Sequence, residues 1–259
     1  MDKKELAATL SGLKIPAFRF FPTIGSTNDV AKQWLSDAAP EYAIVIADQQ
    51  TSGRGRQGRT WVTTSGASIA LSIILYPTKK ELTRIGLFSL AAGLAVTQTI
   101  SAFCDGMVQV KWPNDVLIDN KKVAGILTES VWKNDQLSGM VIGIGINVYK
   151  QAVPPDSALR FPATCMQDHS KIKLARIKII TRLIESILVF RPLIKKDNFS
   201  QRYEQQMAFL HQNITLHRTE SKKISGKLTG IDTGGNLLLR MEDDQIRAFP
   251  VGDISLRLI

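Results

Sequence analysis

Residues 53–59 read Gly53-Arg54-Gly55-Arg56-Gln57-Gly58-Arg59. Glycine tolerates backbone conformations that are closed to other residues, so three glycines this close together let backbone N–H groups converge on a ligand. The arginines add planar guanidinium groups that match phosphate or carboxylate oxygens and keep their charge at any accessible pH. The stretch therefore predicts an anion-binding loop. A solvated basic surface loop is the alternative that this stretch alone leaves open.

Two known phosphate-binding signatures resemble this stretch in spelling. Its glycine spacing fits the G-x-G-x-x-G of dinucleotide-binding folds, and its length approaches a Walker A loop with Arg59 in place of the lysine. Both signatures require a helix immediately afterwards, whose N-terminus meets the phosphates. Residues 61–66 instead indicate a turn, and residues 68–75 a strand. Both signatures are therefore rejected, and the loop is expected to connect two strands.

Composition places the chain among globular proteins. The 259 residues are 44% hydrophobic, which is enough for one large core with or without a small second domain. The net charge of +10 raises nucleic acid, an acidic membrane or an acidic protein as partners. No helix-turn-helix, zinc-finger or RNP pattern is visible, and the basic residues are scattered along the chain. Nucleic acid is therefore the weaker of these readings.

Cysteine usage and apolar segments indicate the compartment. Cys104 and Cys165 have neither C-x-x-C spacing nor histidine companions, so neither a disulfide framework nor a zinc site is predicted. The N-terminal residues lead into no apolar segment of signal-peptide length. Residues 82–103 are as long as a membrane span but carry Arg84 and Gln98, which favours a buried helix. We expect a cytoplasmic protein without a membrane segment.

The first half of the chain predicts strands and helices on both sides of the loop. Ser26 and Asp29 have capping-box spacing, and the apolar residues after them repeat at helical period, which predicts a helix over Thr27–Ser36. Ser26 is therefore expected to cap this helix, although a role in a binding site stays open. Short apolar runs predict strands at 15–22, 42–47 and 68–75, followed by the buried helix at 82–103.

A second informative stretch runs from Met107 to Ile118. Pro113 cannot donate to a ladder, so a strand ends there and leaves Lys111 at its inner end. Tight turns at 119–122 and 134–135 then predict an antiparallel arrangement of strands at 123–129 and 139–148. Glycines 143 and 145 alternate in the last strand and share one face. A flat ligand ring or a closely packed helix could lie against that face.

The remainder of the chain predicts two helices followed by a small all-β unit. Residues 172–193 and 199–210 have amphipathic patterns, and short strands separated by turn residues follow from residue 213. The predicted class is α+β: a mixed or antiparallel sheet with flanking helices, then a small β-barrel. We place the domains at 1–212 and 213–259.

Five motifs in series resemble those of biotin protein ligases. They are Ser-Thr-Asn at 26–28, Gly-Arg-Gly-Arg-Gln-Gly-Arg-x-Trp at 53–61, Lys-Trp-Pro-Asn-Asp at 111–115, Lys-x-Ala-Gly-Ile-Leu-x-Glu at 122–129 and Gly-Ile-Gly-Ile-Asn at 143–147. The order of the motifs matches as well, and the resemblance covers about residues 20–259. It implies a catalytic domain similar to class II aminoacyl-tRNA synthetases, followed by a C-terminal SH3-like barrel.

The resemblance implies an enzyme, a biotin–[biotin carboxyl-carrier protein] ligase. Such enzymes join biotin to ATP, with Mg²⁺ sharing the phosphate charge, and then pass biotin to a lysine of a biotin carboxyl carrier domain. Repressor-type members carry a winged helix-turn-helix before the Ser-Thr-Asn motif, and only 25 residues precede that motif here. The expected protein is therefore monofunctional, binds no nucleic acid and no membrane, and could form a homodimer.

The resemblance also assigns site residues by motif. Reaction at the α-phosphate is expected to depend on the catalytic residues Lys111, Arg54, Arg56 and Asp115. The residues expected to bind biotin are Ser26, Thr27, Asn28, Gln50, Gly53, Arg54, Lys111, Trp112, Gly125, Gly143 and Gly145. The residues expected to bind ATP are Arg54, Arg56, Arg59, Trp61, Lys111, Asn114, Asn147 and Arg257. No protein ligand is assigned to a metal. Asp115 has an alternative reading as an ordinary turn residue.

Two other functions compete with this one. A lipoate or octanoate ligase or transferase of the same superfamily would use similar chemistry, but those families lack the glycine-arginine loop. A non-catalytic module that grips phosphate or nucleic acid is the other alternative, and it leaves the motif at 111–115 unexplained. Biotin-dependent release of pyrophosphate distinguishes the three.

Overall fold

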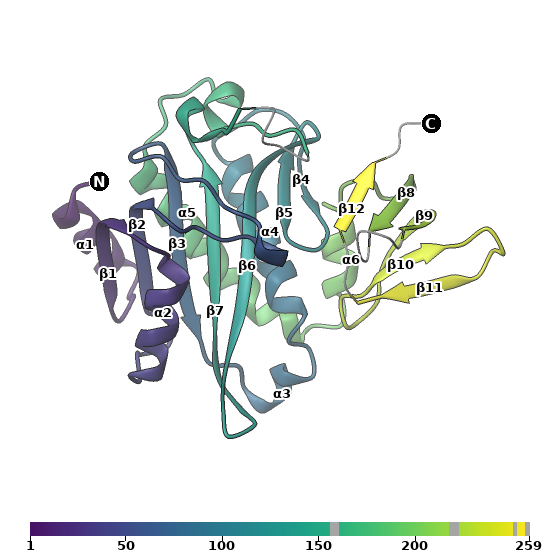
Figure 1. Cartoon of the computed structure of the whole chain (residues 1–259), viewed down its shortest axis with the longest axis horizontal. Helices are drawn as coiled ribbons and strands as arrows, with labels where there is room; N and C mark the ends of the chain where they lie inside the picture. The colour runs from purple at the N-terminus through teal and green to yellow at the C-terminus, as the bar shows by residue number, and fades with distance from the viewer. Residues whose placement is uncertain (156–160, 218–222, 251–252, 257–259) are drawn as a thin grey trace.

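A computed structural model of the chain describes residues 1–155, 161–217, 223–250 and 253–256. Its larger sheet has seven strands in the order β1-β2-β3-β7-β6-β5-β4 (Figure 1). β1 and β2 run parallel and the other neighbouring strands run antiparallel, so the sheet is mixed, as predicted. The strands are β1 (Phe18–Ile24), β2 (Ile44–Gln50), β3 (Ser68–Leu75), β4 (Val108–Lys111), β5 (Asp115–Ile118), β6 (Lys121–Lys133) and β7 (Gln136–Asn147).

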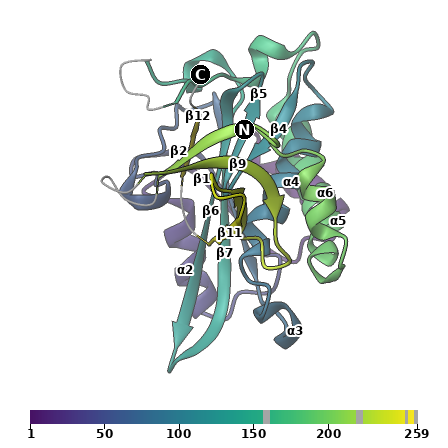
Figure 2. The same cartoon turned by 90° about the vertical axis from the view of Figure 1, so that its right-hand side faces the viewer.

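Helices cover both faces of this sheet. α2 (Thr27–Ser36) packs on one face, against β2, β3 and β7. α4 (Leu87–Ser101) and α5 (Arg176–Phe190) pack on the opposite face, and α1 (Lys3–Gly12) packs against α5 (Figure 2). The shorter helices are α3 (Lys79–Leu82) and α6 (Phe199–Glu204). The segment after β2 crosses the sheet on the same face as α2 (Figure 1).

The core lies between the sheet and the pair α4–α5. All residues of β3 are buried, which explains why its sequence is a continuous apolar run rather than an alternating one. α4 is apolar on nearly all sides because it packs between the sheet and α5. The hydroxyl of Ser72 is an exception in β3: it is buried on the face that α2 covers.

Local sequence signals predicted several elements correctly. The helix over Thr27–Ser36 is confirmed with its bounds. Turns at Asp119–Asn120 and Asn134–Asp135 join the antiparallel strands, and these residues adopt the positive φ angles that such tight turns require. The capping box was wrong: Ser26 occupies the N-cap position, but its side chain makes no capping hydrogen bond. The Asp29 carboxylate instead binds Arg54 and Lys32.

Three predicted helices are shorter than expected. The segment at 82–103 contains the end of α3 and then α4, because Thr78 and Glu81 form a capping box that starts a separate short helix. α5 begins at Arg176 and gives way to a 3₁₀ turn (Arg191–Lys195) that contains Pro192. α6 ends at Glu204, because residues 206–208 leave the helix and pair with Val110 of β4.

A second, antiparallel sheet of five strands follows, in the order β11-β10-β9-β8-β12. Its strands are β8 (Asn213–His217), β9 (Lys223–Ile231), β10 (Leu237–Arg240), β11 (Ile246–Phe249) and β12 (Asp253–Leu256). The predicted all-β unit is thus present, and the domain boundary near residue 212 stays our proposal. Across the described ranges of the chain, no helix is long and apolar enough to cross a membrane.

Candidate active site

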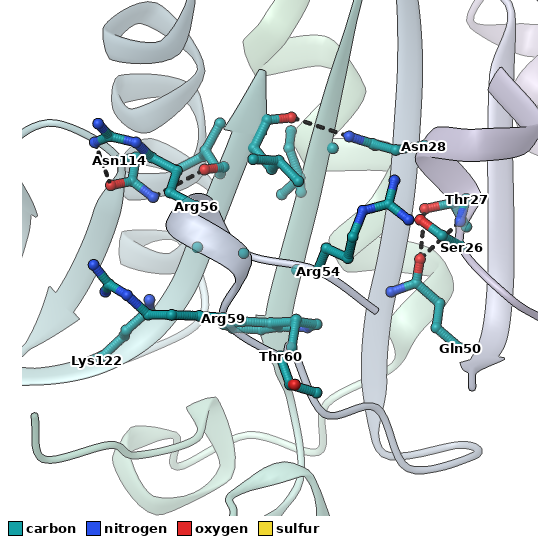
Figure 3. Close-up of a pocket in the computed structure, with 18 residues that line it drawn as sticks. Ser26, Thr27, Asn28, Gln50, Arg54, Arg56, Arg59, Thr60, Asn114 and Lys122 are labelled. Atoms are coloured by element: carbon teal, nitrogen blue, oxygen red, sulfur yellow. Dashed lines mark hydrogen bonds between the residues drawn. The ribbon is translucent and has the colours of Figure 1, made fainter. Parts of the chain in front are cut away.

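A cavity of ≈ 100 Å³ lies between α2, residues 53–61 and the α2 face of the sheet (Figure 3). We call residues 53–61 the glycine-arginine loop. Two backbone hydrogen bonds close the loop, Gly55 N to Arg59 O at 2.7 Å and Trp61 N to Gly53 O at 2.9 Å. Gln57 and Gly58 turn its tip with positive φ angles of 57° and 70°. The predicted anion-binding stretch therefore forms one wall of the cavity.

Neutral hydrogen-bonding groups form one end of the cavity, which we call the neutral end: Ser26, Thr27 and Gln50 (Figure 3). Gln50 Oε1 accepts from Thr27 N at 2.8 Å and from Thr27 Oγ1 at 2.9 Å. Ser72 Oγ lies 2.8 Å from Thr27 Oγ1. α2, β2 and β3 thus fix these side chains relative to one another before any ligand arrives.

Asn28 connects the neutral end to β6 and β7. Its Nδ2 donates to Glu129 Oε2 at 2.7 Å, and its Oδ1 lies 2.6 Å from Ser72 Oγ. Gly143 lies directly under this amide, so close that a Cβ atom at residue 143 would collide with Asn28 Oδ1. Glycine at this position therefore makes room for a side chain of α2, which was one of the two readings of the glycine face.

Trp61 lies against the other glycines of that face. An ideal Cβ atom on Gly145 would collide with its indole ring, and one on Gly125 would lie 3.1 Å from its Cζ3 atom. The indole thus occupies the space that these two glycines leave over the sheet. Pockets for drug-sized ligands measure roughly 300–1,000 Å³. The cavity is smaller than that, so we expect its lining, which includes the glycine-arginine loop and Trp61, to rearrange around a ligand of this size.

Positive groups form the opposite end of the cavity, which we call the cationic end: Arg56, Arg59 and Lys122 (Figure 3). Arg56 donates to Asn114 Oδ1 at 3.3 Å, and burial lowers the pKa of its guanidinium. Lys122 Nζ lies 2.6 Å from Asp115 Oδ1 and 5.5 Å from the centre of the Trp61 ring. The cationic end is suited to an anion such as a phosphate or carboxylate.

Lys111 lies behind the cationic end rather than on the cavity lining. Its side chain is buried, with Nζ 3.7 Å from Asp115 Oδ2 and 4.8 Å from the centre of the Phe161 ring. Burial lowers the pKa of Lys111, and the charges of Lys122 and Arg59 lower it further against the opposing effect of Asp115. Asp115 therefore links the buried lysine to the one that faces the cavity.

Arg54 lies between the two ends and is held by carboxylates (Figure 3). It donates to both oxygens of Asp29, at 2.7 and 2.5 Å, and lies 3.7 Å from Glu129. The Arg54 hydrogen bond holds the pKa of Asp29 at about 2. Lys32 Nζ joins this cluster, 2.7 Å from Glu129 and 3.2 Å from Asp29. In this arrangement Arg54 fastens the start of the loop to α2.

The structure brings together most of the residues that the sequence assigned. Those that line the cavity are Ser26, Thr27, Asn28, Gln50, Arg54, Arg56, Arg59, Trp61, Asn114, Gly125, Gly143 and Gly145.

Five assigned residues lie elsewhere, Lys111 behind the cationic end among them, and one is not described. Gly53 packs under the Trp61 carbonyl, where a Cβ atom would collide. Trp112 does not line the cavity: its indole donates to Gly235 O at 3.0 Å. Asn147 is buried and donates to Thr164 O at 3.1 Å. Asp115 lies beside the cavity, as described above. Arg257 lies outside the described residues.

Sequence reasoning gave no role to several residues that the fold brings to the site. Lys122 and Glu129 stand at the two ends of a motif that was quoted without functions for them. Ser72 was hidden in an apolar run, where a hydroxyl in the middle of a buried strand was the available signal. Asp29 was assigned to a helix cap. These contacts span long distances in sequence, so local spacing did not reveal them.

Known proteins are similar to this chain along most of its length. The model of the Biotin/lipoate A/B protein ligase family matches residues 20–147, and that of the Biotin protein ligase C terminal domain matches residues 209–257. The Bifunctional ligase/repressor BirA of Bacillus spizizenii is 34% identical over 247 residues, which cover 90% of this chain and 72% of the relative. The Biotin--[acetyl-CoA-carboxylase] ligase of Paracoccus denitrificans is 30% identical over 224 residues, or 83% of this chain and 90% of the relative.

A solved structure agrees with these matches. The biotin protein ligase from Aquifex aeolicus, solved in complex with biotin and ATP, has a TM-score of 0.78 and 28% sequence identity to this chain. The similarity covers 93% of this chain and 99% of the Aquifex chain. It includes the large mixed sheet and the small C-terminal unit together.

Proposed function

The chain belongs to the biotin/lipoate A/B protein ligase family, and we propose that its cavity binds biotin at the neutral end and the phosphates of ATP at the cationic end. The chain is an ATP-dependent biotin protein ligase. The observation that carries the site assignment is the division of one cavity into a neutral and a cationic end. Biotin has the same division, since its ureido ring is neutral and its carboxylate is charged.

At the neutral end, the ureido ring requires hydrogen-bond donors for one oxygen and acceptors for two N–H groups. Thr27, Ser26 and Gln50 offer hydroxyl and amide groups of both kinds. Thr27 and Gln50 already hold each other in position at 2.8 and 2.9 Å. Such pre-arranged groups lower the entropy that binding loses.

At the cationic end, we propose that the two anionic reactants meet. A carboxylate oxygen of biotin attacks the α-phosphorus of ATP, the bond to the pyrophosphate oxygen breaks, and pyrophosphate leaves with the electron pair. Lys122, Arg56 and Arg59 reduce the repulsion between the reactants and stabilise the charge that builds up in the transition state. The Asp115 carboxylate forms an ion pair with Lys122, with Oδ1 2.6 Å from Nζ, and so holds its ammonium group in place, while the buried Lys111 adds positive charge from behind.

In the second step, the amine of an acceptor lysine attacks the acyl carbon of biotinoyl-5′-AMP. The bond to the AMP oxygen breaks, and an amide forms. We propose that the acceptor lies on a biotin carboxyl carrier domain, since relatives of this chain are named as ligases of acetyl-CoA carboxylase. Trp61 and Asn147 are proposed to contact the adenine, which requires the indole to leave the face of Gly145.

Mg²⁺ enters this proposal as part of the MgATP substrate. Among the described residues, no group of three or more His, Cys, Asp or Glu side chains could hold a metal ion. Mg²⁺ is commonly held by one or two carboxylates together with substrate phosphates, so a protein cage is not required. A cytoplasmic location, a homodimer and the absence of nucleic-acid binding also remain predictions. Titration with duplex DNA at physiological salt tests the last of them.

The deciding experiment measures pyrophosphate release from purified protein with MgATP, with and without biotin. Lipoate and octanoate serve as comparison acids. We expect release that depends on biotin and is absent with the other two acids. Pyrophosphate release with lipoate and not with biotin would make lipoate the substrate, as in the lipoate ligases of the same family. If no acid leads to pyrophosphate release, the proposed adenylation step is contradicted.

A further inference from the structure

Trp112 stands inside the Lys111–Asp115 motif but points away from the cavity. It is 2% exposed, and its Nε1 donates to the carbonyl of Gly235, which lies 123 residues further along the chain. Lys111, directly before it, and Asn114, two residues after it, belong to the cationic end or its support. The indole therefore connects the reactive part of the large sheet to the C-terminal sheet.

The acceptor carbonyl belongs to a turn that is held rigidly. Asp232 Oδ1 accepts from Gly234 N at 2.9 Å and from Asn236 N at 2.8 Å, and its Oδ2 accepts from Asn236 Nδ2 at 2.8 Å. Gly235 has a φ of +85°, which favours glycine. The Asp232 side chain thus sets the position of the Gly235 carbonyl.

This turn also rests on α4. A Cβ atom on Gly235 would lie 2.8 Å from Leu87 Cδ2 and 2.9 Å from Leu90 Cδ1, so the backbone of the turn approaches the helix closely. Ser200 of α6 donates to Asp232 O at 3.1 Å. The turn is therefore fixed by two helices of the catalytic domain as well as by its own hydrogen bonds.

A second connection holds the same edge of the sheet. β4 is a short edge strand, and the chain that leads into the C-terminal sheet pairs with it: Val110 N donates to Gln206 O and Ala208 N donates to Val110 O, both at 2.8 Å. Glu204 Oε1 then accepts from Ile231 N of β9 at 2.9 Å. Figure 1 shows α6 on the side of the large sheet that faces the second sheet, and α6 contacts β9.

We propose that Trp112 is a positioning residue through which the C-terminal sheet sets the place of Lys111, Asn114 and Asp115. The proposal rests on the function proposed above and extends it. Lys111 ends the four-residue edge strand β4, Asn114 lies in the turn that follows and Asp115 begins β5. Pairing alone holds the backbone weakly at the end of so short an edge strand. Asn114 in turn orients Arg56, and Asp115 orients Lys122. A small displacement of Trp112 would therefore also displace Arg56 and Lys122 at the cationic end.

A positioning residue and a residue that lines the pocket are expected to change different kinetic constants. A residue that lines the biotin pocket changes the KM for biotin when it is altered. A residue that positions the groups around the reacting phosphate changes kcat, because those groups act most strongly in the transition state. Displacements near 1 Å are enough to lower rates substantially.

The test compares three variants of the full chain. Trp112→Phe removes the indole N–H and keeps an aromatic ring in the core. Asp232→Ala loosens the turn from the other side of the contact, away from the cavity. Trp132→Phe makes the same chemical change as the first variant at an indole that is 62% exposed and serves as the control.

We expect Trp112→Phe and Asp232→Ala each to lower kcat for biotin-dependent pyrophosphate release about tenfold, the amount that corresponds to one hydrogen bond. The KM for biotin should change less than about twofold, because neither residue lines the cavity. The double variant should be no slower than either single one, since both changes break the same connection. Hydrogen exchange at residues 110–116 should accelerate in both variants and not in Trp132→Phe.

Several outcomes would overturn the proposal. A raised KM for biotin with unchanged kcat would make Trp112 a binding residue. If the double variant loses as much kcat as the two single variants together, Trp112 and Asp232 act independently. If Trp112→Phe has the same kinetics as Trp132→Phe, Trp112 is a core residue without a positioning role. Failure of the proposed function appears separately, as an inactive wild type, and the exchange measurement still tests the connection in that case.

Discussion

The two ends of the cavity are built in different ways. The neutral end consists of neutral side chains at the start of α2 and the end of β2, and two of them, Thr27 and Gln50, are held by hydrogen bonds of 2.8 to 2.9 Å to each other and to Ser72. The cationic end consists of long side chains, two of them on the glycine-arginine loop. On the function proposed above, this difference predicts that a rigid surface recognises the neutral ring and that a mobile loop delivers the charged groups.

Electrostatics supports the same contrast. Arg56, Arg59 and Lys122 repel one another. Among the contacts described above, the Asp115 carboxylate is the group whose negative charge offsets theirs. A bound anion would relieve this repulsion, so the cationic end gains more order from its ligand than the neutral end does. The predictions that follow test whether the two ends separate catalysis from binding.

The largest effect is expected at the cationic end, from Lys122→Ala. We expect single-turnover formation of biotinoyl-5′-AMP to fall about 10²- to 10³-fold, because a positioned cation acts mainly on charge that develops in the transition state. Lys111→Ala should also reduce adenylation, by orders of magnitude and without loss of the fold. Rapid-quench measurement of biotinoyl-5′-AMP checks both variants.

The matched control for this prediction is Lys121→Ala, an exposed lysine beside Lys122 on the same strand. It should leave the adenylation rate unchanged. If Lys122→Ala adenylates at the wild-type rate, the cationic end is not where the reaction occurs. Unchanged adenylation in Lys111→Ala would limit that lysine to packing.

At the neutral end, Thr27→Val should weaken biotin binding and leave the chemical step nearly intact. The substitution preserves shape but removes the Oγ1 donor to Gln50, which leaves a partly buried acceptor without that partner. Such a loss costs about 1–3 kcal/mol, so the KM for biotin should rise about 5- to 150-fold. Steady-state kinetics with varied biotin measures the change.

Thr51→Val provides the control, since this exposed threonine makes the same change just outside the neutral end. A fall in kcat without a change in KM for Thr27→Val would contradict the division of the cavity into a binding end and a reacting end.

The contrast also explains what the sequence could predict. The helix over Thr27–Ser36 and the turns at 119–120 and 134–135 follow from signals within a few residues, and the structure has them at those positions. The motif resemblance identified most of the cavity lining, because motifs record residues that meet in space. It placed Trp112 in the biotin pocket, although Trp112 does not line the cavity, and it gave no role to Lys122, which does. Both differences have a physical reason.

The direction of a side chain depends on partners that are distant in sequence. Trp112 turns toward a carbonyl 123 residues away, and Lys122 reaches the cavity because Gly125 and Asp115 pair across β5 and β6. The Ser26–Asp29 spacing predicted a cap, but Arg54, 25 residues further on, takes the Asp29 carboxylate. Local spacing therefore predicts elements well, and it predicts side-chain partners poorly where competing charges converge.

A moderate effect is expected in the dynamics of the loop. Residues 52–60 should exchange amide hydrogens several-fold more slowly with biotinoyl-5′-AMP bound than without it, because the ligand offsets the repulsion among the cations. The amides of α2 should change little. Hydrogen exchange followed by mass spectrometry resolves the two segments within one sample. Equal protection of residues 52–60 in both states would contradict a mobile cationic end.

The smallest effect concerns the ion pair that fastens Arg54 to α2. Both partners are substantially exposed, so Asp29→Asn should lower the free energy of unfolding by only about 0.5 kcal/mol at pH 7. The folded-state pKa of Asp29 is lowered from 3.8 to about 2, so the folded protein binds fewer protons than the unfolded chain between these values. The stabilisation is therefore complete above about pH 5 and is lost as the pH falls toward 2. Urea unfolding of the wild type and the variant from pH 7 to pH 3 measures this difference, with Asp37→Asn near the end of α2 as the control. A difference that stays constant down to pH 3 would mean that Asp29 is not paired with Arg54, and the loop would then be held by its backbone contacts alone.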